Sequence, residues 1–341
     1  MQNKNKIIII CGPTGIGKTG FAIEIAKRFN GEIIGADSMQ IYKYMDIGTA
    51  KPDKSERELA PHHLIDFLEP DEEFDAGKYM QAADAAINDI YYRSNFTSSN
   101  LALSKVPIPK IPIVVGGTGF YIKALLHGLF RDRTVDKEVI DKLEREKEEN
   151  GSFELHKRLS LLDPEAAKRI HPNDGFRVVR ALEVVEVTGK PISNFQDQHG
   201  FSSERYFTLK IGLYMDRAKL YERIEKRVDI MIEQGFVDEV KQLISKGYDC
   251  SLKSMQSIGY RHICEFLHGQ TLQNDIQRDL GFESDDGYLR PISWEETIRL
   301  LKRDTRRYAK RQLTWFRQDK DINWLEPHEL DEAQELIKRF L

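Results

Sequence analysis

Cysteine is scarce in this chain, with only Cys11, Cys250 and Cys264 among 341 residues. Three cysteines at these wide spacings are too few for a disulfide framework or a cysteine-rich zinc module. Such a cysteine content fits a reducing compartment, and we therefore expect a cytoplasmic location.

A long hydrophobic run is also missing from the start of the chain. Met1–Lys6 is polar and basic, and the apolar run Ile7–Cys11 that follows is far shorter than a signal-peptide core or a membrane span. We therefore expect neither export nor a membrane partner.

A strong net charge is absent as well, because 51 basic and 55 acidic residues leave a formal charge of −4. This value argues against nucleic acid bound over the whole surface, but a net charge hides local asymmetry. The segment Arg299–Arg317 is rich in lysine and arginine and leaves room for a basic patch. With 40% apolar residues, the chain can bury the core of one large or two ordinary domains.

What the chain does contain is a pattern of short buried strands and helices. Ile7–Cys11 is apolar and β-branched, a glycine-rich stretch follows it, and Phe21–Phe29 has apolar residues at helical spacing. Glu32–Gly35 and Ile111–Val115 repeat the buried-strand pattern, which predicts an α/β fold with a parallel sheet. Further expected elements are a helix at Phe74–Tyr91, a strand at Tyr206–Met215, helices at Arg217–Gln234, Val237–Lys246 and Ile292–Phe316, and loops at Arg93–Pro112 and Gly281–Gly287.

The region after Asp136 interrupts this pattern. Its charge density and apolar spacing are helical to about Gly189, which predicts a helical insertion in the α/β core. We therefore divide the chain into three parts. Residues 1–135 form the first part of a P-loop NTPase-like core, 136–204 a mostly helical insertion, and 205–341 the rest of the core with further helices.

One motif has a specific chemical meaning. Gly-Pro-Thr-Gly-Ile-Gly-Lys-Thr fits the complete pattern G-x-x-x-x-G-K-[ST] and lies between a strand and a helix, as a P-loop requires. Backbone N–H groups and the positive end of the helix dipole surround phosphate oxygens in such a loop. The lysine adds a positive charge, and the threonine hydroxyl can bind Mg²⁺. The predicted phosphate site comprises Gly12, Pro13, Thr14, Gly15, Ile16, Gly17, Lys18 and Thr19.

The usual acidic partner of a nucleotide-hydrolysing P-loop is missing. ATPases and GTPases carry an acid at the end of another strand to organise Mg²⁺ and water, but Ile111–Val115 runs into Gly-Gly-Thr. The nearest acid is Asp37, after the strand Glu32–Gly35. Because carboxyl ends of parallel strands share one crevice, we expect Asp37 to face the phosphate site, where it can bind Mg²⁺ or accept a proton. The alternative role for Asp37 is to cap a turn or helix.

Several longer motifs accompany the P-loop in a fixed order and span nearly the whole chain. Together they resemble the tRNA dimethylallyltransferase family, and this match is much more specific than a P-loop alone. The motifs are Asp37–Tyr42, Met45–Pro52, Pro61–Asp66, Gly116–Tyr121, Ile170–Asp174 with Arg177, Arg180–Val184, Ile258–Tyr260 and Ala309–Phe316.

The resemblance implies a reaction and roles for particular residues. In this family the P-loop holds the pyrophosphate of dimethylallyl pyrophosphate, and the acceptor is N6 of the adenosine 3′-adjacent to the anticodon in tRNAs that read codons beginning with U. Asp37 would accept the proton of the attacking amine, while Mg²⁺ and Lys18 neutralise the leaving pyrophosphate and Thr19 holds the metal. Arg217 and Arg223 resemble arginines near the pyrophosphate, with a solvated helix face as their alternative role.

The resemblance also implies a face for the tRNA anticodon stem-loop. The adenosine must leave the base stack before it reaches a buried electrophile. Gly175-Phe176 stands where many relatives carry a glutamine before the first arginine. The chain departs from the family pattern here, because it lacks the polar contact that the glutamine would make. A monomer suffices for the mechanism. The residues implied on the tRNA side are Asp37, Ser38, Met39, Gln40, Thr118, Phe176, Arg177, Val178, Val179 and Arg180.

The last long helix carries a basic face that we expect to meet phosphates of the anticodon stem. A solvated helix surface is the alternative role for these residues. The segments Arg93–Pro112 and Leu272–Arg290 are longer than the family core requires. The basic face comprises Arg303, Arg306, Arg307, Lys310 and Arg311.

Two other functions stay open. Adenylate prenyltransferases of the cytokinin type also combine a P-loop with an aspartate at this place, and would prenylate free adenine nucleotides. The helical insertion and the basic last helix favour tRNA, because a nucleotide needs no such surface. A P-loop NTPase that switches RNA-binding partners would instead hydrolyse ATP or GTP; the missing acid after Ile111–Val115 and the lack of an Asn-Lys-x-Asp motif argue against it.

Overall fold

The fold is organised around β1, Lys6–Cys11, which lies inside a parallel sheet. In the computed structural model, the described residues are 4–99, 110–129, 136–199, 204–269 and 292–341. Within them the sheet has six strands in the order β3-β2-β4-β1-β5-β6. The other strands are β2 (Gly31–Gly35), β3 (His62–His63), β4 (Ile111–Gly116), β5 (Phe207–Leu213) and β6 (Asn323–Leu325). The predicted α/β class with a parallel sheet is confirmed.

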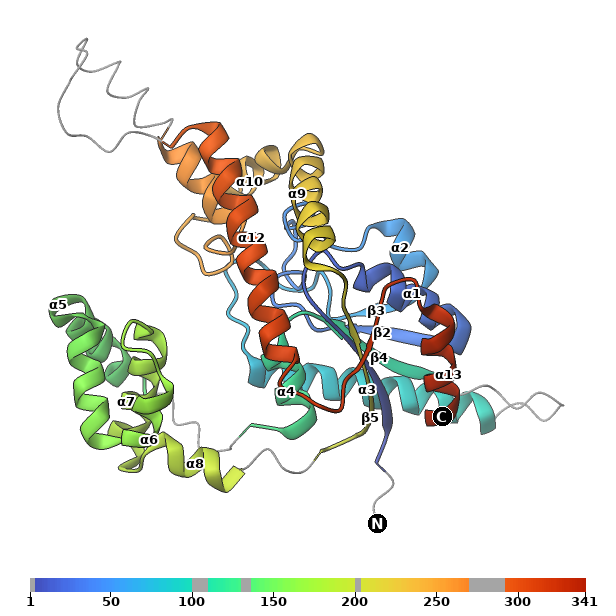
Figure 1. Ribbon diagram of the computed structural model, residues 1–341, viewed down its shortest axis with the longest axis horizontal. Coiled ribbons are helices and arrows are strands. Elements are labelled where there is room, and N and C mark those ends of the chain that lie inside the picture. The colour runs from blue at the N-terminus through green and yellow to red at the C-terminus, as the bar shows by residue number, and fades with distance from the viewer. Residues whose placement is uncertain (1–3, 100–109, 130–135, 200–203, 270–291) are drawn as a thin grey trace, which may run out of the picture. The chain divides into compact units, whose positions relative to one another are not determined.

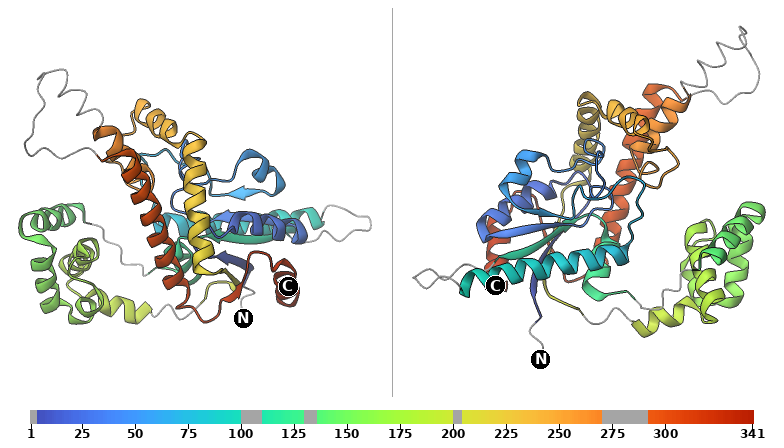
Figure 2. Two further views of the ribbon diagram at one scale, coloured as in Figure 1. Left: turned by 45° about the horizontal axis from the view of Figure 1, so that its top comes forward. Right: turned by 180° about the vertical axis from the view of Figure 1, so that it is seen from behind.

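Helices cover both faces of this sheet, which explains why β1 is apolar at nearly every position. Ile8 and Ile10 pack into a core shared with α1 (Lys18–Phe29) and α13 (Leu330–Phe340). Alternate residues of a strand point to the opposite face. There α3 (Ala76–Ser99) packs against β2 and β4, as the two views of Figure 2 show.

A second set of helices stands beyond the carboxyl ends of the strands. α9 (Arg217–Glu233) begins shortly after β5 and lies beside α12 (Trp294–Phe316), as Figure 1 shows. α10 (Phe236–Ser245) and the helical residues 260–269 complete this set. Their shared core includes Val228, Met231, Phe236, Val240, Tyr260 and Leu301.

The chain divides into two compact units. One comprises Met1–Leu126 and Tyr206–Leu341, and the other is His127–Arg205. The second unit is helical, and its core is built mainly from α5 and α7. No helix among the described residues is both long and apolar enough to cross a membrane. The remaining helices are α2 (Lys54–Leu59), α4 (Gly119–His127), α5 (Lys137–Leu162), α6 (Pro164–Arg169), α7 (Gly175–Thr188) and α8 (Ile192–His199).

The predicted loop Arg93–Pro112 is wrong at its start, because α3 continues to Ser99, whereas β4 begins at Ile111, as the predicted strand Ile111–Val115 does. After Tyr91 the helix continues through residues whose sequence has no clear helical period. Arg93 makes a two-pronged contact with Glu32, at 3.2 and 2.9 Å, and also bonds Asp89 at 2.8 Å. Strands β3 and β6 were not predicted because two or three residues are too short to show a pattern. Residues 100–109, Gly281–Gly287 and Leu272–Arg290 lie outside the described residues.

A disulfide joins Cys250 to Cys264, which the sequence analysis did not predict. The two cysteines are 14 positions apart, and the turns and the helix between them bring their sulfur atoms together. The spacing of the cysteines in the sequence does not show this. Cys11 is a free, buried cysteine, and burial raises the pKa of its thiol to about 12. Cys11 is therefore a protonated and unreactive core residue at neutral pH.

Thiol counting tests this pairing. The protein unfolded without reductant should expose one titratable thiol per chain, and reduction should raise the number to three. A cross-link over a loop of this length contributes about 3 kcal/mol to the free energy of unfolding in the chain-entropy model, so reduction should lower the denaturation midpoint. As a control, Cys11→Ala should leave no titratable thiol before reduction. Three thiols in the unreduced wild type would disprove the disulfide.

Candidate active site at the carboxyl ends of the strands

The P-loop connects the end of β1 to the start of α1. Gly15 and Gly17 have φ angles of 81° and 101°, a left-handed region in which other residues are strained. Ile16 between them is fully buried and anchors the loop in the core. The loop faces a cavity of about 210 Å³ that we call the P-loop pocket. Its lining includes Thr14, Gly15, Gly17, Lys18, Thr19, Asp37, Gln40, Thr49, Ala50, Arg223, Arg227, Tyr308 and Gln312.

The P-loop pocket is lined by cationic side chains. Lys18 Nζ donates hydrogen bonds to the carbonyl oxygens of Gly12 (3.0 Å) and Pro13 (2.8 Å). Burial lowers the pKa of Lys18 to about 8, against the opposing effect of the Asp37 carboxylate. Burial also lowers the pKa of Arg227, whose guanidinium donates to the Thr14 hydroxyl at 2.8 Å. Cations that have lost water favour an anion with several oxygens, such as a pyrophosphate.

A glutamine from the other end of the chain holds the P-loop in place. Gln312, on α12, is only 6% exposed. Its Oε1 accepts the N–H of Thr14 at 2.8 Å, and its Nε2 donates to the carbonyl of Gly117 at 2.9 Å. One amide therefore joins the loop after β1 to the loop after β4. The sequence analysis included Gln312 in a motif but gave it no role, because local spacing cannot show a contact across 298 positions.

Asp37 follows β2 and also lines the P-loop pocket. Its Oδ1 accepts the backbone N–H groups of Met39 (2.9 Å) and Gln40 (3.3 Å), and the neighbouring N–H of Ser38 donates to the hydroxyl of Thr118 at 3.1 Å. Among the described residues, no hydrogen bond to Asp37 Oδ2 is formed. The turn-capping role and an acid–base role are therefore compatible, because each uses a different oxygen.

A second cavity, of about 230 Å³, meets the P-loop pocket at Asp37. We call it the apolar pocket, because its walls include Met39, Val228, Met231, Phe236, Ile258 and Leu301. Burial and the nearby Asp37 carboxylate raise the pKa of Tyr308 to about 12, so its hydroxyl keeps its proton at neutral pH. Asp37 thus stands where a cationic and an apolar cavity join. The residues that line both are Thr14, Asp37, Thr49, Arg227 and Tyr308.

The two arginines predicted on α9 differ in position. Arg223 lines the P-loop pocket. Arg217 is exposed, and its guanidinium lies 5.1 Å from the centre of the Tyr221 ring. Arg227, which lines both pockets, was not predicted from the sequence. Its position four residues after Arg223 was a usable signal, because residues at this spacing share one helix face.

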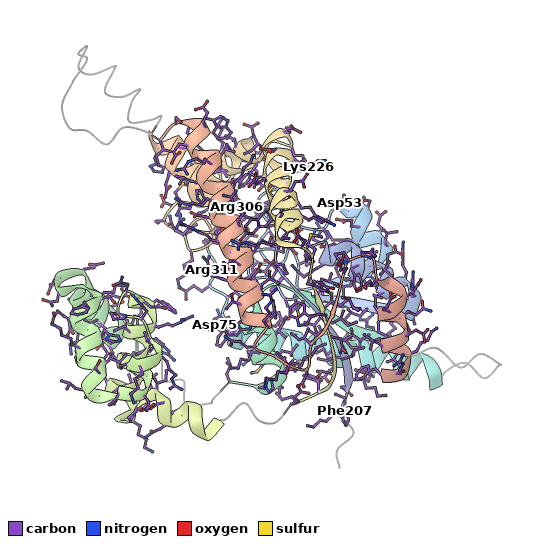
Figure 3. All side chains as sticks on the ribbon, in the orientation of Figure 1. Asp53, Asp75, Phe207, Lys226, Arg306 and Arg311 are labelled. Carbon is purple, nitrogen blue, oxygen red and sulfur yellow. A yellow bond between two sulfur atoms is a disulfide. The ribbon has the colours of Figure 1, made fainter. Side chains whose placement is uncertain are left out.

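The predicted basic face on α12 is largely occupied by ion pairs. Arg303 and Arg307 pair with Asp304, at 2.8 and 3.5 Å, and Arg306 pairs with Glu225 of α9. Arg311 is exposed and lies 5.7 Å from the ring centre of Tyr308. Figure 3 shows Arg306 and Arg311 projecting from α12 and Lys226 from α9. Contact with tRNA at this face stays a prediction.

The predicted tRNA residues of α7 have unequal access to solvent. Phe176 is 78% exposed, and the side chain of Arg177 is 66% exposed with a 3.3 Å ion pair to Asp174. Arg180 pairs with the buried Glu183. Val178 and Val179 are buried in the core of the helical unit. Phe176 and Arg177 are therefore the most accessible of these candidates for RNA.

The sheet, the P-loop and the two joined pockets define a class of P-loop protein whose anion site opens onto an apolar cavity. The sequence model of the family described as IPP transferase matches residues 40–319, and that described as isopentenyl transferase matches residues 5–66. A tRNA dimethylallyltransferase of Desulfosudis oleivorans is 47% identical over 337 residues, which cover 98% of this chain and 96% of the relative. The chain belongs to the IPP transferase family.

Solved structures show the same relationship. A tRNA delta(2)-isopentenylpyrophosphate transferase from Staphylococcus epidermidis is 40% identical, with a TM-score of 0.65, and the match covers 98% of this chain and 100% of that one. A eukaryotic dimethylallyltransferase, described as acting on tRNA, is 30% identical with a TM-score of 0.73. That match covers 98% of this chain and 77% of the eukaryotic one. The similarity therefore extends over nearly the whole chain.

The lowered pKa of Lys18 predicts a limb in the pH profile of donor capture. Nζ must carry its proton to attract a phosphate, and it loses this proton as the pH rises through about 8. The kcat/KM for the pyrophosphate donor, which reports the free enzyme, should therefore fall above this pH. Lys18→Arg should remove the limb, because arginine stays charged to much higher pH. An unchanged limb in Lys18→Arg would exclude Lys18 as its source.

The α9 arginines supply a matched pair of variants. Arg223→Ala should weaken binding of dimethylallyl pyrophosphate by about 1.5–3 kcal/mol, the usual value of a hydrogen bond to a charged group. Arg217→Ala removes the same charge from an exposed position and should leave the affinity near that of the wild type. Titration calorimetry with each variant measures both effects. Equal losses would show that long-range charge, and not contact in the pocket, determines the affinity.

Proposed function

We propose that the protein transfers the dimethylallyl group from dimethylallyl pyrophosphate to N6 of the tRNA adenosine 3′-adjacent to the anticodon, in tRNAs that read codons beginning with U. The observation that carries this proposal is the position of Asp37 at the junction of a cationic and an apolar pocket. The names of the relatives support the same reaction.

The two chemical halves of the donor match the two pockets. The pyrophosphate lies in the P-loop pocket, where Lys18, Arg223, Arg227 and the N–H groups at the start of α1 neutralise its charge. The five-carbon chain is hydrophobic and extends towards the apolar pocket. The allylic carbon then lies near Asp37, which lines both cavities.

The acceptor step requires a base. The adenine N6 amine is a weak nucleophile and must lose a proton as it bonds to the allylic carbon. Asp37 Oδ2 accepts this proton, while Oδ1 stays bound to the turn. The bond between the allylic carbon and the pyrophosphate oxygen breaks with both electrons leaving on pyrophosphate. The products are N6-dimethylallyladenosine in tRNA and free pyrophosphate.

Mg²⁺ fits this site. The described residues contain no group of three or more His, Cys, Asp or Glu side chains that could hold a metal ion. Mg²⁺ commonly needs only one or two protein ligands, because substrate phosphates and water supply the rest. Thr19, which lines the P-loop pocket, would hold the ion through its hydroxyl, and the bound ion would add positive charge beside the leaving group.

The tRNA approaches the junction from the side of the Asp37 turn. Asp37, the proton acceptor, is followed directly by Ser38, Met39 and Gln40. The hydroxyl of Thr118 accepts a hydrogen bond from the same turn. Further contacts with the RNA come from Phe176 and Arg177, the accessible residues at the start of α7, and from the basic face of α12. The reaction as written requires no residue from a second chain, so a monomer suffices for the mechanism. We place the enzyme in the cytoplasm because its acceptor is tRNA; the cysteine content no longer supports this location, since the Cys250–Cys264 disulfide is not typical of a reducing compartment.

The proposed function is tested by incubating the protein with Mg²⁺, labelled dimethylallyl pyrophosphate and either unmodified tRNA or free adenine nucleotides. Digestion then identifies the labelled nucleoside. We expect label on the adenosine beside the anticodon. Label only on free nucleotides would assign the enzyme to the cytokinin type, and hydrolysis of ATP or GTP without any label would favour the P-loop switch.

Asp37→Asn tests the base directly. The amide can still accept the N–H groups of Met39 and Gln40, but it cannot take a proton. We expect kcat to fall about 10²–10⁴-fold, the usual contribution of a general base, with donor affinity preserved. Asp71→Asn, a change at an exposed carboxylate outside both pockets, is the control. Near-normal turnover in Asp37→Asn would refute the assignment.

A further inference from the structure

Glu239 lines neither of the two pockets, yet its carboxylate collects four hydrogen bonds. Three come from the successive backbone N–H groups of Asp46 (2.9 Å), Ile47 (2.7 Å) and Gly48 (3.1 Å). The fourth comes from the hydroxyl of Tyr260 at 2.5 Å. Successive N–H groups form a natural site for an anion, and a charged acceptor strengthens each bond. Glu239 of α10 therefore anchors the segment Met45–Ala50, which we call the wall loop.

The wall loop needs this anchor because its backbone is tightly constrained. A Cβ atom at Gly48 would lie 2.2 Å from the ring of Phe236, so only glycine allows this approach. Ala50 has a φ of 49°, in the left-handed region that non-glycine residues seldom adopt. Such conformations persist only where the surroundings hold them.

Tyr260 keeps its donor role across the physiological pH range. Its side chain is fully buried, and burial together with the Glu239 carboxylate raises the pKa of its hydroxyl well above the ordinary value. Tyr260 also lines the apolar pocket, against Phe236. The anchor is therefore in contact with the wall of that pocket.

The wall loop is connected to Asp37 by hydrogen bonds of Gln40. Thr49 lines both pockets, and its carbonyl oxygen accepts a hydrogen bond from Gln40 Nε2 at 3.2 Å. The carbonyl of Ala50 accepts from the same nitrogen at 3.0 Å. The backbone N–H of Gln40 donates to Asp37 Oδ1 at 3.3 Å. Hydrogen bonds at both ends of the wall loop, joined by its backbone from Gly48 to Ala50, thus connect Glu239 to Asp37 through Gln40.

We propose that Glu239 is a positioning residue for prenyl transfer, a role that rests on the proposed function. It holds the wall loop between the two pockets and, through Gln40, sets the direction of the Asp37 carboxylate. The donor pyrophosphate is held elsewhere, by Lys18 and Arg223. Loss of Glu239 therefore slows the transfer step and leaves donor affinity unchanged.

Glu239→Gln tests this role, because it keeps the size of the side chain but replaces one acceptor oxygen with an NH₂ group that cannot accept. Misplacement of a reacting group by 1 Å can cost about 10²-fold, so we expect kcat to fall by roughly 10- to 100-fold without a change in Kd for dimethylallyl pyrophosphate. Asp238→Asn, at the neighbouring exposed carboxylate, should leave both constants unchanged. An unchanged kcat, or a donor affinity that falls as far as kcat, would overturn the proposal.

A double-mutant cycle separates positioning from a general loss of structure. Gln40→Ala removes the link between the wall loop and Asp37, so Glu239→Gln added to this variant should slow the transfer little further. A purely structural role would give the full effect of Glu239→Gln in both backgrounds, and that result would exclude the path through Gln40.

Hydrogen exchange tests the anchor without substrate. The amides of Asp46, Ile47 and Gly48 should be protected in the wild type and exchange faster in Glu239→Gln. Equal exchange in the two proteins would contradict the anchor whatever the activity.

The activity measurements separate failure of this inference from failure of the proposed function. A wild type that prenylates no tRNA would overturn the proposed function. An active wild type whose rate Glu239→Gln matches would overturn this inference alone.

Discussion

The active site depends on the way Gln312 joins two loops at the carboxyl edge of the sheet. In a parallel sheet all strands end at one edge, so the loops after β1, β2 and β4 converge there. Convergence alone leaves their buried backbone groups in need of partners. The amide of Gln312 supplies one acceptor to Thr14 and one donor to Gly117. The last long helix is therefore part of the phosphate site and covers it.

The electrostatics of the site follow from this enclosure. Lys18 and Arg227 lose water, and burial lowers the pKa of each, so both gain from a bound anion. The carboxylate of Asp37 opposes the effect of burial, because its negative charge raises the pKa of both side chains. The adjoining cavity is apolar, so the transfer of a hydrocarbon group from water into it is favourable. A prenyl pyrophosphate suits both environments at once, because its pyrophosphate is anionic and its five-carbon chain is apolar.

Much of this arrangement was predictable, and the failures have a common cause. The P-loop and the position of Asp37 near it follow from contiguous residues and from the geometry of parallel strands. Arg227 had a usable signal in its spacing from Arg223. Gln312 and Glu239 had none, because their partners lie 298 and about 190 positions away. The extension of α3 to Ser99 was missed because the residues after Tyr91 have no clear helical period, and the contact of Arg93 with Glu32 joins positions 61 apart.

Local patterns and the order of the motifs were enough to predict the fold class, the phosphate-binding loop and the family. Three features could be read only from the folded chain: which arginine of α9 lines the P-loop pocket, which oxygen of Asp37 is left for a proton, and where an apolar cavity meets the phosphate site. These features depend on packing between elements distant in the chain. The direction of a side chain across such a contact is set by the three-dimensional fold and has no local signature.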